Sequence, residues 1–95
     1  MAAYLIADID VADAQAYEGY KAGVSASIAA FGGRYLTRGG KTEVLEGAWV
    51  PKRLVIVEFP SMETLRAWYE SPEYQPLRDL RRRASDSKLV VTEGI

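Results

Sequence analysis

The sequence predicts an α+β fold, with four strands in one antiparallel sheet and the helices packed on one face of that sheet. Two observations lead to this prediction. Strand-like and helix-like segments follow one another in the order β-α-β-β-α-(α)-β, which is the split βαβ or ferredoxin-like plan. One segment beyond the middle of the chain is apolar at almost every position, as is typical of a central strand. No linker, repeat or low-complexity tract interrupts the order, so residues 1–95 are expected to form a single domain.

The first third of the chain predicts a strand and a long helix. Residues 4–11 form a strand pattern that is apolar on both alternating sets until Asp8 and Asp10. Asp13 is expected to cap the following helix, because its carboxylate can accept hydrogen bonds from the free amides of the first turn. The helix ends at Gly32, since glycine adopts the left-handed conformation at little steric cost. The inward face of this helix carries Tyr17, Tyr20, Val24, Ile28 and Phe31.

The middle of the chain predicts the next two strands. Residues 34–38 are rich in aromatic and β-branched side chains, and residues 41–47 are expected to continue them as a bulged or bent strand. Residues 48–52 read as a loop. The strongest strand pattern covers residues 53–59, where Glu58 is the one charge within the two alternating sets.

Two helix starts follow that strand. Ser61, after Pro60, is the expected N-cap of a helix whose inward residues are Leu65, Trp68 and Tyr69. Ser71 and Pro72 repeat the start signal, because serine caps helices and proline favours the first helical position. The extra short helix that they begin would carry on its inner face Tyr74, Leu77 and either Leu80 or Arg81. Residues 88–93 form the last predicted strand.

Composition limits the available chemistry. The 12 Lys and Arg against 13 Asp and Glu give a net charge of −1, which argues against a nucleic-acid partner. The absence of His and Cys removes the common soft-metal ligands, the thiol nucleophile and the imidazole base, so neither a metal nor a cofactor is expected. No segment approaches the ~20 apolar residues of a membrane span, and the N-terminus lacks the basic start of a signal peptide. A soluble, cytoplasmic protein with no membrane partner is therefore expected.

A homodimer is predicted from the sheet itself. Residues 4–9 and 54–59 present apolar side chains to both faces, whereas the helices cover only one. The second face would leave an apolar patch larger than monomers normally expose. A second copy of the chain, packed sheet face to sheet face, would cover it.

Four motifs resemble those of a known family: GGRYLTRGG, EVLEGAW, RLVIVEFPS and WYESPEYQ, at residues 32–40, 43–49, 53–61 and 68–75. Through them the chain resembles a bacterial family of uncharacterised proteins, DUF1330, over essentially its whole length. The resemblance implies the dimeric α+β barrel superfamily, which also contains cofactor-free antibiotic-biosynthesis monooxygenases, muconolactone isomerases and haem enzymes. It implies no particular reaction. The absence of His removes the usual proximal ligand of a haem iron.

Charged strand residues supply the first candidate site. Glu58 lies in an otherwise apolar strand, where an unpaired carboxylate is costly. It is either a base or ligand-anchoring group with a raised pKa, or a strand-end acid ion-paired with Arg34, Arg38 or Arg53. Strand alternation predicts that the side chains of Arg34 and Arg38 project from the same face of the strand, where they would bind a carboxylate or phosphate. The alternative is that these arginines are solvated charges that protect an edge strand.

Aromatic residues around the loop and the second helix are further candidates. Trp49, Trp68, Tyr69 and Tyr74 could together line a ligand pocket, because Trp and Tyr combine apolar area with a polar group. Helical spacing favours Trp68 as a core residue, and the position of Trp49 in a loop favours a dimer interface over a lid. The Tyr74 hydroxyl could reach Glu58 or an arginine.

Two charged clusters are interpreted as structural. Residues 78–83 are rich in arginine but contain no interleaved aromatic residues, so a solvated helix face is favoured over an RNA contact. Asp8 and Asp10 share a strand face, but no third metal ligand follows. They are expected to solvate the strand end.

Two functions remain open from the sequence, which does not decide whether the chain is an enzyme. The first is a cofactor-free enzyme or binder with a pocket between sheet and helices, acting on a small organic acid or enol by proton abstraction or a monooxygenase-like reaction. Glu58 would be its base, Arg38 its anion anchor, and Tyr69 or Tyr74 its hydroxyl donor. The second is a non-catalytic dimeric interaction or structural module.

Overall fold

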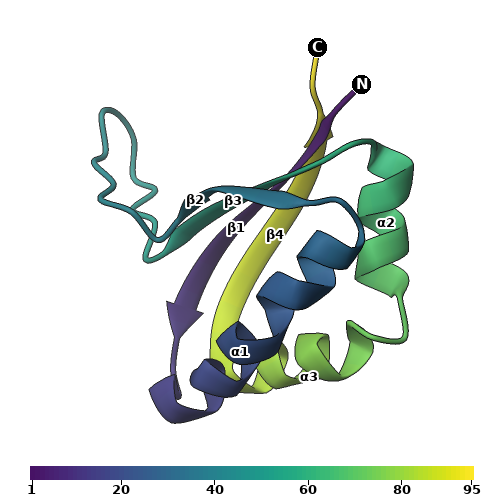
Figure 1. Ribbon diagram of the computed structural model, residues 1–95. Coiled ribbons are helices and arrows are strands. Elements are labelled where there is room, and N and C mark those ends of the chain that lie inside the picture. Colours follow the sequence, from purple (N-terminus) through teal and green to yellow (C-terminus); the bar gives the residue numbers. More distant parts are fainter.

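The computed structural model describes residues 1–95 and confirms the predicted α+β, ferredoxin-like plan (Figure 1). Its strands are β1 (Ala3–Val11), β2 (Arg34–Arg38), β3 (Leu54–Phe59) and β4 (Ser85–Glu93); its helices are α1 (Ala14–Ala30), α2 (Met62–Glu70) and α3 (Gln75–Ala84). The strands form one sheet in the order β2-β3-β1-β4, and every neighbouring pair is antiparallel. None of the helices is both long enough and apolar enough to cross a membrane.

The helix starts follow from local capping, with one correction. The side chains of Asp13 and Ser61 each accept a hydrogen bond from the backbone amide three residues later, at 3.0 and 3.1 Å, which confirms both predicted N-caps. The predicted third start is wrong, because α3 begins at Gln75 and Pro72 lies in a turn. Ser71 instead lies between α2 and α3. Its hydroxyl donates to the Trp68 carbonyl at 2.8 Å and accepts from the Tyr74 amide at 3.3 Å.

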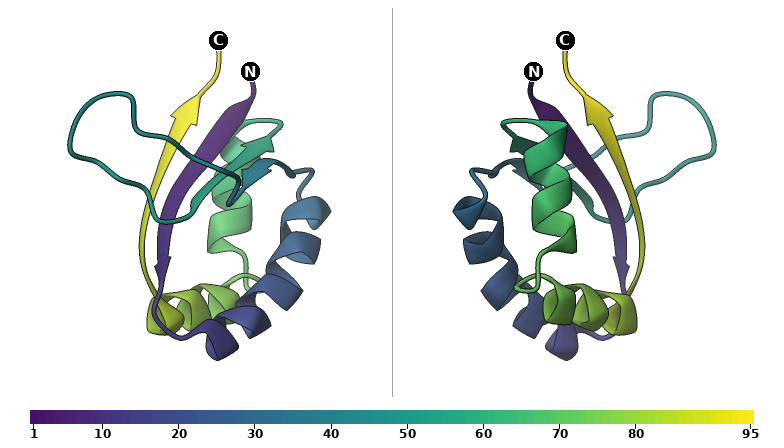
Figure 2. Two further views of the ribbon diagram at one scale, coloured as in Figure 1. Left: turned by 90° about the vertical axis from the view of Figure 1, so that its left-hand side faces the viewer. Right: turned by 90° about the vertical axis from the view of Figure 1, so that its right-hand side faces the viewer.

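The segment between β2 and β3 is a long loop, whereas a continued strand was predicted over residues 41–47. Gly39 ends β2 with a φ of 72°, a conformation that L-residues with side chains rarely adopt. Its amide donates to the Leu54 carbonyl, which marks the start of β3. The loop then extends away from the sheet, and α1 and α2 lie on the opposite side (Figures 1 and 2).

The strand β4 begins three residues earlier than residue 88, where the pattern placed its start. Residues 85–87 are Ser, Asp and Ser, which have little intrinsic preference for strands. They nevertheless pair with residues 9–11 of β1, because β4 follows directly after α3 without a loop. Pairing with a neighbouring strand therefore overrides the local propensity.

The core lies between the sheet and the helices. The largest fully buried side chains are Trp68, Tyr74, Phe59, Leu65 and Val57. The Trp68 ring lies 5.4 Å from the Phe59 ring and 4.1 Å from the Tyr74 ring, measured between centroids. Gly23 permits a close approach between α1 and α3, since a Cβ at this position would lie 2.9 Å from a methyl group of Leu77.

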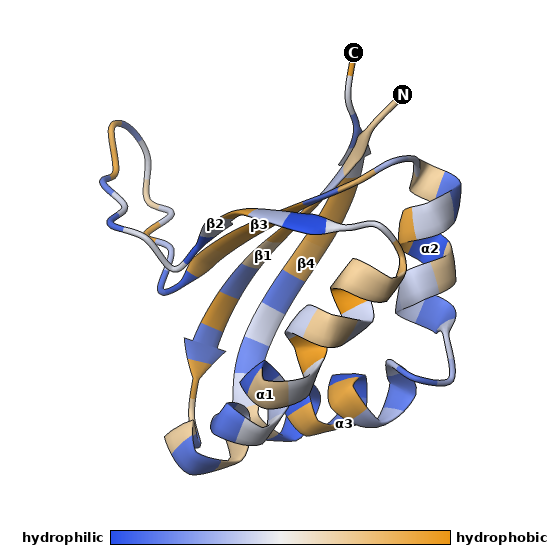
Figure 3. Ribbon diagram, viewed as in Figure 1, coloured by the Kyte–Doolittle hydropathy of each residue, from blue (hydrophilic) through white to orange (hydrophobic).

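The opposite face of the sheet is covered by no helix, and we call it the open face. Its central part is apolar, with Ile6 of β1, Ile56 of β3 and Val90 of β4 side by side in the strand register. Val90 is 61% exposed. The hydrophilic residues of β1 lie toward its C-terminal end (Figure 3), where Asp8 pairs with Lys88. The predicted double-sided apolar character of the central strands is therefore present in the fold.

Candidate functional site

Glu58, the predicted base, lies on the open face within an ion pair. One carboxylate oxygen accepts a hydrogen bond from Arg34 Nε at 2.7 Å, and the other accepts one from the Tyr4 hydroxyl at 3.1 Å. The hydrogen bond from Arg34, and then that from Tyr4, lower the pKa of Glu58 below its usual value. Of the two alternatives left open for Glu58, the raised pKa is wrong, and the ion pair, with Arg34 as the partner, describes this residue.

Arg34 and Arg38 lie on opposite faces of the sheet, so the prediction of a shared face is wrong. The register of β2 against β3 shifts between Tyr35 and Thr37, which marks a β-bulge. The extra residue reverses the alternation of side chains. Arg38 consequently turns toward the helices, where its Nη1 donates to the Ser25 hydroxyl of α1 at 3.0 Å. Its guanidinium carbon lies 4.5 Å from the centre of the Tyr35 ring.

Trp49 is held against the open face by Asp8. The indole Nε1 donates to one Asp8 carboxylate oxygen at 2.8 Å, and the Lys52 amide donates to the other at 2.9 Å. These two hydrogen bonds, that of Trp49 first, lower the pKa of Asp8. Asp8 thus anchors the long loop, a role beyond the strand-end solvation expected of it. The indole of Trp49 is 60% exposed, so its predicted part in a dimer interface stays a prediction.

Trp68 is a core residue, as its helical spacing indicated. Its side chain is completely buried, and its Nε1 donates to the Ser27 hydroxyl of α1 at 3.1 Å. It lines none of the cavities described below. Trp68 is therefore not in a position to contact a ligand in either cavity.

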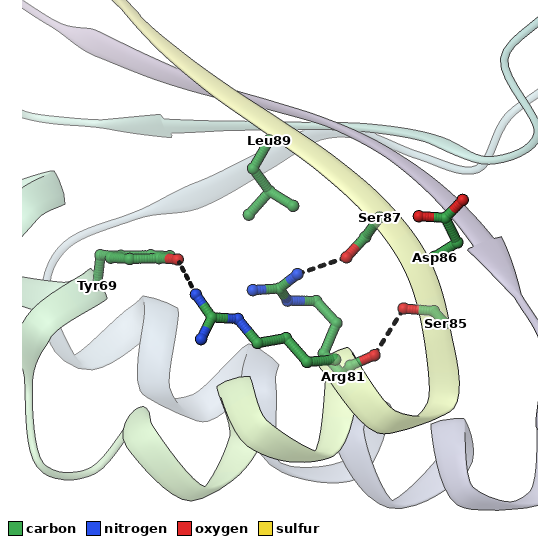
Figure 4. Close-up of a pocket in the computed structure, with 7 residues that line it drawn as sticks. Tyr69, Arg81, Ser85, Asp86, Ser87 and Leu89 are labelled. Carbon is green, nitrogen blue, oxygen red and sulfur yellow. Dashed lines mark hydrogen bonds between the residues drawn. The ribbon is translucent and has the colours of Figure 1, made fainter.

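An open cavity lies on the helix side of β4, between this strand and the ends of α2 and α3 (Figure 4). It arises because α2 packs over β1 and β3, while α3 packs mainly against α1, so part of β4 is left uncovered. Its volume is about 350 Å³. The residues that line it are Tyr69, Arg81, Arg82, Ser85, Asp86, Ser87 and Leu89. We call this space the polar cavity.

Arg81 is the central group of the polar cavity. The residue is only 3% exposed, and no carboxylate lies within ion-pairing distance of it. Its Nε donates to the Tyr74 hydroxyl at 3.4 Å and its Nη1 donates to the Ser87 hydroxyl at 2.5 Å, whereas Nη2 has no protein partner. The Asp86 carboxylate points away from this guanidinium (Figure 4). A buried cation without a counter-ion, beside a cavity, is suited to hold a small anion.

A buried hydroxyl network supports Arg81 from behind. Tyr74 is completely buried, and its hydroxyl lies 2.9 Å from that of Tyr20 in α1. The Tyr74 oxygen accepts from Arg81 Nε, and either of the two tyrosine hydroxyls can donate to the other. Burial raises the pKa of Tyr20 far above its ordinary value, so this hydroxyl stays protonated. Of the two partners predicted for Tyr74, the arginine is the one found.

Tyr69 lies at the edge of the polar cavity. Its hydroxyl is 3.5 Å from Nη2 of Arg82, and the Arg78 guanidinium lies 5.6 Å from its ring centre. The ring also borders a second, adjoining cavity of about 250 Å³. The residues that line this apolar cavity are Leu5, Leu65, Arg66, Tyr69, Glu70, Leu89 and Val91. Tyr69 and Leu89 therefore lie where the two cavities meet.

Sequence reasoning missed Arg81 as a site residue. The run of residues 78–83 was interpreted as a solvated helix face, which is wrong for Arg81 although Arg82 and Arg83 are exposed. The signal was present in the helical period: Arg81 lies seven residues after Tyr74, two turns along the same face. Of the two inner-face alternatives, Leu80 and Arg81, it is Arg81 that is fully buried. The predicted site residues do not converge, since only Tyr69 and Tyr74 lie at or next to the polar cavity.

Comparisons with known proteins agree with this fold. The model of the domain of unknown function DUF1330 matches residues 2–95. A protein of unknown function from Rhodopseudomonas palustris is 18% identical, with a TM-score of 0.78 over 99% of this chain and 82% of that one. SnoaB, a cofactor-independent oxygenase from Streptomyces nogalater, is 13% identical, with a TM-score of 0.68 over 99% and 93%. A dimeric ferredoxin-like protein of unknown function from Thermobifida fusca is 15% identical, with a TM-score of 0.66 over 99% and 92%. No curated protein matches the sequence.

Proposed function

The chain belongs to the DUF1330 family, and we propose that it acts as a homodimer that binds a small organic anion in the polar cavity of each subunit. The observation that carries this proposal is the buried Arg81 guanidinium, which has no carboxylate partner and borders the cavity. Burying this cation without a counter-ion costs free energy, and a bound anion would offset that cost. The likeness of fold to a cofactor-independent oxygenase supports a reaction without a bound cofactor.

The open face supports the homodimer. Ile6, Ile56 and Val90 form an apolar centre on a face that no helix covers, and charged residues such as Glu58 and Lys88 surround it. Two such faces packed together would remove this apolar area from water. The dimeric ferredoxin-like protein from Thermobifida fusca has the same fold, which adds support by analogy.

Proton abstraction beside a carbonyl is the reaction that this pocket would favour. A fixed guanidinium stabilises a developing enolate oxygen more than a neutral carbonyl, so Arg81 would lower the barrier. Glu70, which lines the adjoining apolar cavity, would accept the proton as the general base. Glu58 takes no part in this scheme, because it lies on the open face and is paired with Arg34.

Titration calorimetry with acetate and benzoate at constant ionic strength tests the binding proposal. Wild-type protein is expected to bind at least one of these anions, and Arg81→Met to weaken that binding by about tenfold or more. Arg83→Met is the matched control, since it removes an exposed arginine from the same helix and should leave binding unchanged. Binding of neither anion, or equal binding by Arg81→Met, would favour the alternative of a non-catalytic dimeric module.

Deuterium exchange tests the reaction. Wild-type protein in D₂O should speed the exchange of the methyl protons of pyruvate, followed by NMR, over the rate in buffer alone. Glu70→Gln should remove most of that acceleration while pyruvate still binds. Exchange at the buffer rate with the wild-type protein would contradict the catalytic part of the proposal.

A further inference from the structure

We infer that the anion bound at Arg81 carries an apolar body, which occupies the apolar cavity beside the polar one. The ligand class is therefore an amphiphilic organic acid, such as an aliphatic or aromatic carboxylate, rather than an inorganic anion or a sugar acid. This inference rests on the proposed function, because it takes Arg81 as the site of the charged end.

The two cavities share residues, which makes a single ligand able to enter both. Tyr69 and Leu89 line each of them, one from the end of α2 and the other from β4. A carboxylate that accepts from Nη2 of Arg81, the guanidinium nitrogen without a protein partner, would therefore have its remaining atoms next to Leu89 and the Tyr69 ring. Figure 4 shows the Arg81 guanidinium lying between Ser87 and Tyr69, with Leu89 on the strand beside them.

The lining changes in character from one cavity to the other. The polar cavity contains two arginines and two serines, whereas five of the seven residues around the second are hydrophobic. Leu65, which lines it from α2, is buried, while Val91 on the strand is still 40% exposed. Apolar surface left exposed inside a concave site is surface that a ligand can cover.

The far end of the apolar cavity limits the ligand. Arg66, one turn before Tyr69 on α2, is an exposed charged residue that lines its edge. An apolar chain that reached it would pass into water and gain nothing more from burial. Affinity is therefore expected to rise with ligand length and then to level off.

A homologous series of carboxylates tests this inference. Acetate, butyrate, hexanoate and octanoate are titrated by calorimetry at constant ionic strength and below micelle-forming concentrations. Each added methylene group is expected to raise the affinity by about fourfold while it enters the apolar cavity, with a plateau once the chain reaches the edge. Affinity that does not change along the series would overturn the inference.

Two variants in β4 make the test specific to the cavity. Val91→Thr keeps the volume of the side chain but replaces apolar by polar surface, so it should weaken hexanoate severalfold and leave acetate unchanged. Val90→Thr is the matched control, because the neighbouring residue faces the open side of the sheet and should leave both affinities unchanged. Equal losses in the two variants would overturn the assignment to this cavity.

The outcomes separate the two proposals. If acetate, octanoate and sulfate all fail to bind, the anion site at Arg81 is wrong and the inference falls with it. If short carboxylates or sulfate bind, and Arg81→Met abolishes that binding while chain length has no effect, the anion site stands and the amphiphilic ligand is wrong. If hexanoate binds equally well to wild type and Arg81→Met, the apolar cavity binds without Arg81, which also overturns the inference.

Discussion

Two arginines, one on each side of the sheet, meet opposite conditions in this molecule. Arg34 lies on the open face, its side chain 71% exposed, and pairs with Glu58 at 2.7 Å. Arg81 lies on the helix side, only 3% exposed, and has hydroxyl partners but no carboxylate. The exposed guanidinium of Arg34, which water already solvates, has a carboxylate counter-ion, whereas the buried guanidinium of Arg81 has none.

This contrast distinguishes a charge with a structural role from a charge that is suited to ligand binding. An exposed ion pair contributes little to stability, because water and salt screen it. A buried cation without a counter-ion is costly, and it is tolerated where a ligand or a reaction makes use of it. The open face is therefore expected to govern assembly and the helix side of β4 to govern ligand binding.

Separate roles for the two faces predict that assembly can be disrupted without affecting the anion site. Ile56→Lys places a charge in the apolar centre of the open face, and the dimer is expected to dissociate with a Kd at least about 100-fold higher, or about 3 kcal/mol. Analytical ultracentrifugation at micromolar concentration measures this change. Gln15→Lys, on the exposed side of α1, adds the same charge and should leave the dimer intact. A dimer that persists in Ile56→Lys would contradict the assignment of the open face.

Deleting one tyrosine hydroxyl on each side of the sheet sharpens the contrast. Tyr74→Phe leaves the buried Arg81 and Tyr20 without a shared partner, so the free energy of unfolding should fall by about 1–3 kcal/mol in urea denaturation. Tyr4→Phe removes a hydroxyl that reaches only the partly buried carboxylate of Glu58, which Arg34 also binds, so a clearly smaller loss is expected. Equal losses in the free energy of unfolding of the two variants would mean that burial of the hydroxyl network does not increase its contribution to stability.

The loop on the open face offers a local test. Asp8→Ala removes both acceptors that hold the Trp49 indole and the Lys52 amide, so Trp49 emission should move to longer wavelength with little change in global stability. Acid should have the same effect on the wild type, because the depressed pKa of Asp8 means that its hydrogen bonds are lost only as the pH falls through that low value. In Trp49→Phe, neither treatment should shift the emission of the buried Trp68.

The smallest effect is expected from the ion pair of Glu58. Its pKa is lower in the folded than in the unfolded chain, so the pair stabilises the fold above about pH 4.3, the ordinary value, and this stability is lost as the pH falls through the folded value. Glu58→Gln should therefore lose slightly less stability than the wild type between pH 7 and pH 3. Urea midpoints at the two pH values measure the difference, and Glu46→Gln in the exposed loop should behave like the wild type.

The strand and helix order was predictable because it depends on hydrophobic period and capping, which are local. The residues of the candidate site were less predictable from the sequence. A single bulge after Tyr35 turned Arg38 to the other face, and no residue in the strand marks such a shift in advance. Arg81 was misread because an arginine run is normally solvated, and its burial depends on how α3 meets β4. Pairing across the sheet, as for Glu58 with Arg34, was visible only as one of several alternatives.

The strand β4 has a consequence for how this family can diversify. Ser87, Leu89 and Val91 face the cavities, while Lys88 and Val90 between them face the open side. If the two faces have the proposed roles, substitutions at single positions are expected to alter ligand preference and assembly independently. A one-residue insertion or deletion within the strand would exchange the two sets of side chains, and so change both properties together. Natural variants are accordingly expected to differ along β4 in residue identity and to keep its length.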